Sequence, residues 1–336
     1  MSSKQINSKD INASNDGNLL QEFSQIVQNF SKINVKEIEP TIKNIDQYIF
    51  EGDLNIVIDE LVDLIFKELN KGKDAIIIMQ YVLDYINDLM ITLQQIYIWL
   101  LSNQKNSNTI CILGYFKYNG IETEINKYKA IELYQKAAEL ENRLAQLNLI
   151  NEHIYGKGVN INYDLLAFQL SKKLAEEEYA CGINNLGFCY ETGIGTDSNE
   201  EKAFELYQKA ADLGNHDGIN NLGGCYYEGI GTEINEEKAF ELYQKAADLG
   251  SSNGISYLGW CYNKGIGTVV NKKKAFELYQ KAANLDNYMA QYSFALIYES
   301  GDGIEKDIDQ AIYWYKKSAA QGHNGAQAKL KKLLKK

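Results

Sequence analysis

The chain has 336 residues, of which 45% are hydrophobic, and it carries a formal net charge of −11. This composition is typical of a folded protein, and the acidic balance argues against nonspecific nucleic-acid binding, which needs clustered Lys and Arg. The first residues lack the apolar run of a secretory signal, and the most apolar stretches, 76–86 and 91–101, are too short to span a bilayer. We therefore expect a cytoplasmic protein without a transmembrane segment.

The N-terminal third does not share the pattern of the rest of the chain. Residues 1–17 are polar and predict a disordered tail. Residues 18–105 predict a helical capping region, with its only proline, Pro40, at a break between helices. Apolar residues recur there at helical spacing over 19–30, 54–65, 76–86 and 93–101. The simplest role for this region is to cover the open end of the array that follows.

From 106 to 322 one unit recurs six times, each with a helix, a Gly-containing turn and a second helix. The turn glycines are 36 or 37 residues apart, and they are Gly120, Gly156, Gly193, Gly229, Gly265 and Gly301. A period of this length indicates stacked helical repeats, and six exceed the roughly three that a stable stack needs. We predict an all-α fold, a right-handed α-solenoid.

Residues 323–336 predict a C-terminal capping helix, and the charge changes sign along the second half of the chain. Residues 191–250 contain 13 acids and 4 lysines, a net −9, whereas residues 251–336 contain 7 acids and 13 lysines, a net +6. The basic end either keeps the terminus soluble or contacts an acidic partner or membrane surface. The polarity can also orient a partner or favour head-to-tail contacts.

The repeated motif resembles the Sel1-like repeat, a relative of the tetratricopeptide repeat. The fourth unit shows it best, as Leu222-Gly223, Tyr226, Gly229-Ile230-Gly231, Lys238-Ala239, Tyr243, Ala246-Ala247 and Gly250. The first unit departs at its loop, the second lacks the glycine, tyrosine and first alanine, and the sixth has Phe294-Ala295 for Leu-Gly. The resemblance implies a scaffold that assembles protein complexes, in signalling, cell-wall synthesis or membrane-protein quality control. The kinase signatures that accompany such arrays in some fungi are absent from the sequence.

Several features that suggest chemistry have simpler explanations. The Gly-x-Gly pairs follow helices and lack the third glycine of a dinucleotide site, so they indicate turns. Five cysteines predict free, buried packing residues, since no paired ligands at short spacing indicate a metal site. The histidines, His153, His216 and His323, lie in different parts of the array without a nucleophile at useful spacing. We predict no catalytic residue, no metal and no cofactor.

The better functional candidate is the inner surface, which the first helices of such stacks line. Asn side chains can hold the backbone of an extended peptide, and aromatic side chains are common anchors. The alternative is that these residues only make ordinary surface or inter-repeat contacts. The candidate groove residues are Asn184, Asn185, Phe188, Asn220, Asn221, Tyr227, Ser256, Tyr257, Trp260 and Tyr292.

The function predicted from the sequence is a non-enzymatic adaptor in intracellular signalling. It would bind extended segments of partner proteins, or a kinase or other enzyme, on its concave face. The alternative is a regulatory activator subunit of an enzyme, such as a protein kinase or a cell-wall synthase. Binding of a specific catalytic partner and a change in its rate would distinguish the alternative.

Overall fold

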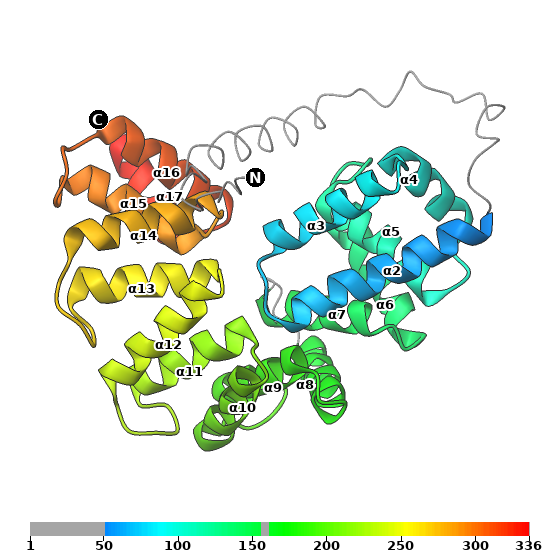
Figure 1. Cartoon of the computed structure of the whole chain (residues 1–336), viewed down its shortest axis with the longest axis horizontal. Helices are drawn as coiled ribbons and strands as arrows, with labels where there is room; N and C mark the ends of the chain where they lie inside the picture. Colours follow the sequence, from blue (N-terminus) through cyan, green and yellow to red (C-terminus); the bar gives the residue numbers. More distant parts are fainter. Residues whose placement is uncertain (1–50, 156–160, 336) are drawn as a thin grey trace, which may run out of the picture.

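The computed structural model describes residues 51–155 and 161–335, which contain 16 helices and no strand. The helix pairs follow one curved path, from α5 through α9 and α11 to α16 (Figure 1). The expected α-solenoid is confirmed. The predicted tail 1–17 and the expected helical stretch 19–30 lie outside the described residues.

The elements comprise an N-terminal group, six helix pairs and a last helix. The N-terminal group is α2 (Glu51–Asn70), α3 (Ala75–Asp88) and α4 (Leu93–Ser102). The first helices of the pairs are α5 (Ser107–Asn119), α7 (Arg143–Tyr155), α9 (Ala180–Thr192), α11 (His216–Glu228), α13 (Ser252–Lys264) and α15 (Tyr288–Ser300). The second helices are α6 (Lys127–Glu139), α8 (Ile161–Glu176), α10 (Glu200–Asp212), α12 (Glu236–Asp248), α14 (Lys272–Asn284) and α16 (Ile308–Ala320), and α17 (Asn324–Leu333) ends the array.

The turn inside the first, third, fourth and fifth pairs is built from a glycine and an asparagine, and the sixth pair has Asp307 in place of the asparagine. In the fourth pair, Gly229 ends α11 in the left-handed conformation, with a φ of 79° that only glycine adopts without strain. The Asn235 side chain then caps α12 by accepting a hydrogen bond from the backbone N–H of Lys238 at 2.9 Å. The first turn of α12 contains Glu236 and Glu237, which favour the positive end of the helix dipole.

Neighbouring pairs interlock through small and aromatic residues. A Cβ added to Gly231 would lie 2.3 Å from the backbone oxygen of Glu200 in the preceding pair, so the turn fits there only as glycine. Phe204 of that pair packs edge-on against Tyr226, with ring centroids 5.5 Å apart. Phe240 and Tyr262 repeat this contact one unit further on, at 5.5 Å. The second glycine and the Phe–Tyr contact therefore set the stacking between repeats.

The N-terminal helices cover the end of the array and also run along its inner side. Helix α4 packs on α5, and α2 packs against the first helices α5, α7 and α9. The described part of the cap thus reaches the third repeat.

The α2–α3 loop continues this contact along the start of three successive first helices. The Asn70 side chain accepts a hydrogen bond from the Cys181 N–H at 3.1 Å, and the Lys71 carbonyl accepts one from the His216 N–H at 2.8 Å. Asp74 caps α13, because its carboxylate accepts hydrogen bonds from the backbone N–H and the hydroxyl of Ser252, each at 2.9 Å. A segment far away in sequence therefore joins repeats three, four and five.

The five cysteines are free and buried, which confirms the prediction of packing residues. Within the described ranges, no single helix has the length and apolarity to cross a membrane. The pair α3 and α4 meets those two criteria only when taken together, and it is bent by 95°.

Candidate protein-binding groove

The first helices α9, α11, α13 and α15 line a groove of about 460 Å³ on the inner side of the array. We call it the groove throughout. Its volume lies in the range of ligand-binding pockets. Seven of the ten candidate residues line it, and these are Phe188, Asn220, Asn221, Tyr227, Ser256, Tyr257 and Trp260.

Aromatic side chains form much of the groove wall. Tyr227 and Trp260 meet edge to face, with centroids 4.7 Å apart. Tyr257 is 41% exposed and stacks on Tyr243, with centroids 4.8 Å apart and planes 19° apart. Such rigid, partly exposed rings are common anchors for peptides.

The structure places Asn184, Asn185 and Tyr292 outside the groove lining. Asn184 and Asn185 are buried and belong to a row of amides between repeats, in which Asn221 donates to the Asn184 Oδ1 at 2.9 Å. Tyr292 packs on His323, with ring centroids 4.3 Å apart, next to the last helix. For these three residues, the structure shows contacts between units.

Asn220 combines a structural contact with a place in the groove. Its Nδ2 donates to the Ser251 Oγ at 2.9 Å, whereas its buried Oδ1 has no hydrogen-bond partner among the described residues. Buried polar atoms are normally paired. This amide is therefore only half satisfied within the part of the chain that the structure describes.

The lining also contains Tyr243 and two acidic residues, which were not among the groove residues expected from the sequence. Glu191 and Glu228 both line the groove, and none of its described lining residues is Lys, Arg or His. The pKa of Tyr257 is raised, first by burial, then by Tyr288, and also by the charges of Glu228 and Glu191. The groove thus carries an uncompensated negative charge.

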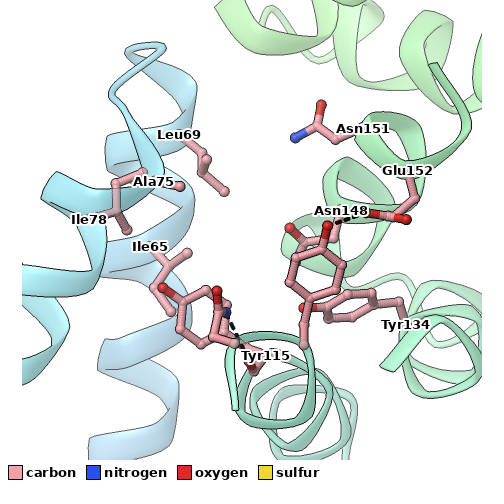
Figure 2. A pocket seen from close by; sticks show the side chains of 11 residues that line it. Ile65, Leu69, Ala75, Ile78, Tyr115, Tyr134, Asn148, Asn151 and Glu152 are labelled. Atoms are coloured by element: carbon pink, nitrogen blue, oxygen red, sulfur yellow. Dashed lines mark hydrogen bonds between the residues drawn. The ribbon is translucent and has the colours of Figure 1, made fainter. Parts of the chain in front are cut away.

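A second, smaller cleft of about 180 Å³ lies between the N-terminal helices and the first two repeats. Figure 2 shows Ile65, Leu69 and Ile78 on one side, facing Tyr115 and Asn148 on the other. Here the inner side of the array is covered by the chain's own α2 and α3. The groove, in contrast, lies further along the array, and no described residue of α2 or α3 is among those that line it.

The three histidines make packing and capping contacts within the array. His153 stacks on Tyr163, with centroids 4.6 Å apart, and the His323 Nδ1 caps α17 by accepting from the Ala326 N–H at 3.0 Å. His216 is buried under the α2–α3 loop, and its pKa is lowered by burial and then by Lys73 and Lys71. Among the described residues, no group of three or more His, Cys, Asp or Glu is placed to hold a metal ion.

The fold and the groove define an α-solenoid repeat protein with an open inner surface. The model of one protein family, the Sel1 repeat, matches six consecutive segments of the chain. They are residues 110–142, 141–179, 182–215, 216–251, 252–287 and 289–323. The chain belongs to the Sel1 repeat family. Proteins of this family are generally non-enzymatic scaffolds for protein–protein interaction.

A solved structure shows the same fold. A Sel1 repeat protein from Oxalobacter formigenes is 28% identical over 69% of this chain and 93% of that protein, with a TM-score of 0.54. The protein c5321, a protective antigen of uropathogenic Escherichia coli strains, is 26% identical over 84% of this chain and 67% of its own, with a TM-score of 0.44. The comparison with curated proteins gives no match.

Proposed function

We propose that this protein is an adaptor that binds extended segments of partner proteins in the groove. A role in intracellular signalling and a cytoplasmic location belong to the same proposal, and their support is the sequence alone. The chain offers a rigid array, an open inner side and side chains suited to hold a peptide.

One observation supports this function best: exposed aromatic rings and polar groups meet in the groove. Trp260 and Tyr227 are half-buried and in mutual contact, so they offer a preformed apolar wall. Asn221 and Asn253 lie in the same lining, and amides can pair with both groups of a peptide backbone. A partner segment would bury the rings and add hydrogen bonds to amides that already join neighbouring repeats.

The test is affinity capture with the whole chain, followed by quantitative mass spectrometry. Removing both Trp260 and Asn220 should reduce partner recovery by about tenfold or more, because truncated anchors typically cost 2 kcal/mol or more. Since Asn220 also bonds Ser251, the variant Trp260→Ala with Tyr227→Ala separates binding from stability.

The matched control is Tyr128→Ala, because Tyr128 is 78% exposed on a second helix, α6, away from the groove. This variant should recover the same partners as the natural chain. Unchanged recovery with both groove variants, in chains that melt normally by calorimetry, would exclude the groove as the binding site.

A further inference from the structure

The fourth repeat departs from its neighbours at the position that opens the groove. Two residues after the motif leucine, the third repeat has Phe188 and the fifth has Trp260, whereas the fourth has Gly224. All three residues line the groove. The missing side chain leaves a hollow between Phe188 and Trp260, and we call it the Gly224 hollow.

A second departure frees a polar group at the base of the Gly224 hollow. In the third and sixth repeats, the tyrosine of the second helix donates its hydroxyl to a glutamate, as Tyr207 does to Glu191 and Tyr315 to Glu299. The fourth repeat has Tyr227 at the place of that glutamate. Within the described residues, the equivalent Tyr243 makes no hydroxyl hydrogen bond, and a Cβ at Gly224 would lie 3.9 Å from its oxygen.

The chemistry around the hollow is anionic and aromatic. Glu191 and Glu228 lie in the same lining, where the described residues include no Lys, Arg or His. Neither carboxylate takes part in an ion pair within the part of the chain that the structure describes. The rings of Phe188, Tyr227 and Trp260 belong to the same lining. A planar guanidinium fits this set, because it forms paired hydrogen bonds with carboxylates and stacks on aromatic faces.

We propose that the Gly224 hollow binds an arginine side chain carried by an extended segment of a partner protein. This inference rests on the proposed function and specifies the chemistry of the partner. In it, Glu191 and Glu228 pair with the guanidinium, the aromatic rings hold its plane, and the Tyr243 hydroxyl offers an oxygen acceptor to its N–H groups.

The chain itself does not supply this arginine. Arg143 is its only arginine, and that side chain already donates to the Tyr179 hydroxyl at 2.5 Å and lies 3.7 Å from Glu177. The basic C-terminal end contains lysines only. A second copy of the chain is therefore a poorer match than a different protein.

The test is fluorescence anisotropy with the full chain and a labelled peptide, Ser-Ala-Xaa-Ala-Ser-Gly, in which the central residue is arginine, lysine or citrulline. Citrulline keeps the shape of arginine without the charge. The arginine peptide should bind about tenfold more tightly than the citrulline peptide and about threefold more tightly than the lysine peptide. Equal binding of arginine and citrulline, equal binding of arginine and lysine, or no binding of any peptide at about 1 mM would overturn the proposal.

Two variants assign the binding to the hollow. Gly224→Trp fills it, and the chain should still fold because a Cβ there contacts nothing closer than 3.9 Å. Gly224→Trp should abolish the preference for the arginine peptide. The control variant Leu296→Trp, at the equivalent position of the sixth repeat, should keep this preference. The pair Glu191→Gln and Glu228→Gln should reduce the arginine-to-citrulline ratio to about one.

The two proposals fail in different ways. If partner capture depends on Trp260 but the three peptides bind equally, the groove is a binding site and the arginine specificity is wrong. If the arginine peptide binds and Gly224→Trp leaves its affinity unchanged, the hollow is not its site. If capture is unaffected by the groove variants, the proposed function itself is overturned.

Discussion

At the residue scale, the second turn glycine of the third, fourth and fifth repeats is restricted by the neighbouring repeat as well as by its own backbone. Gly231 has a φ of 63° and lies against the backbone of Glu200. Gly250 also has a positive φ, 87°, but a Cβ there would meet nothing within 4 Å. Substitution of Gly250 therefore measures the free-energy cost of backbone strain alone, whereas substitution of Gly231 adds the cost of a steric clash.

We predict that Gly231→Ala lowers the free energy of unfolding by about 2–4 kcal/mol, because it adds overpacking to backbone strain. Gly250→Ala should cost only about 1 kcal/mol, since it adds strain alone. Urea unfolding followed by circular dichroism measures both. Equal losses for the two variants would mean that the close approach between repeats does not restrict the turn.

At the element scale, the α2–α3 loop places carboxylates beside the start of α11. Burial, and then the nearby Asp74, raise the pKa of Asp217 to about 7. Burial also raises the pKa of Asp74. Lys71 and Lys73 of the loop pair with Glu68 of α2 at 2.7 Å, and these three charges act on His216. The contact between the loop and the array is therefore sensitive to pH.

We predict that Asp217 weakens loop docking as pH rises from about 5 to 8. A carboxyl whose pKa is higher in the folded chain binds its proton more tightly there, so stability falls as pH rises between the unfolded pKa, near 4, and the folded pKa, near 7. Relative to Asp217→Asn, the natural chain should lose stability of order 1 kcal/mol over this interval. The comparison cancels the opposite contribution of His216, whose lowered pKa favours docking at higher pH.

Urea midpoints of the two chains at pH 5.5 and pH 8 provide the measurement. Hydrogen exchange at the start of α11 and α13 reports the same docking locally, and it should become faster at pH 8 in the natural chain beyond its intrinsic pH dependence. A stability difference between the chains that does not change with pH would show that Asp217 does not carry this effect.

The same elements show what the sequence can predict. The repeat pairs and their turns follow from Gly229 and Asn235, because caps and glycine turns act locally and recur with the period. The docking of Asp74 on Ser252 joins residues 178 positions apart, and no period or local propensity indicates it. The sequence shows that Gly224 stands where the neighbouring repeats have Phe188 and Trp260. That the Tyr243 hydroxyl makes no hydrogen bond among the described residues depends on how α12 packs, and the sequence does not indicate it.

At the scale of the whole molecule, the α2–α3 loop changes how the repeats cooperate. A simple solenoid has contacts between neighbours only, so its repeats can unfold in separate steps. Here one loop bonds with the starts of α9, α11 and α13. It therefore links repeats that would otherwise communicate through their neighbours alone.

We predict that releasing this loop makes unfolding less cooperative. Gly72 has a φ of 70°, and a Cβ there would lie 2.9 Å from the Asp217 N and 3.0 Å from the His216 N, so Gly72→Trp should displace the loop. In the natural chain, Trp fluorescence and circular dichroism should give coincident urea transitions. In Gly72→Trp they should separate, and the apparent m-value should fall by about a quarter or more. Gly214→Trp is the matched control, because Gly214 has a φ of 79° and a Cβ there would meet no described atom within 4 Å. If Gly214→Trp separates the two transitions as strongly as Gly72→Trp, backbone strain at any loop glycine explains the effect. The α2–α3 loop is then not the link between repeats.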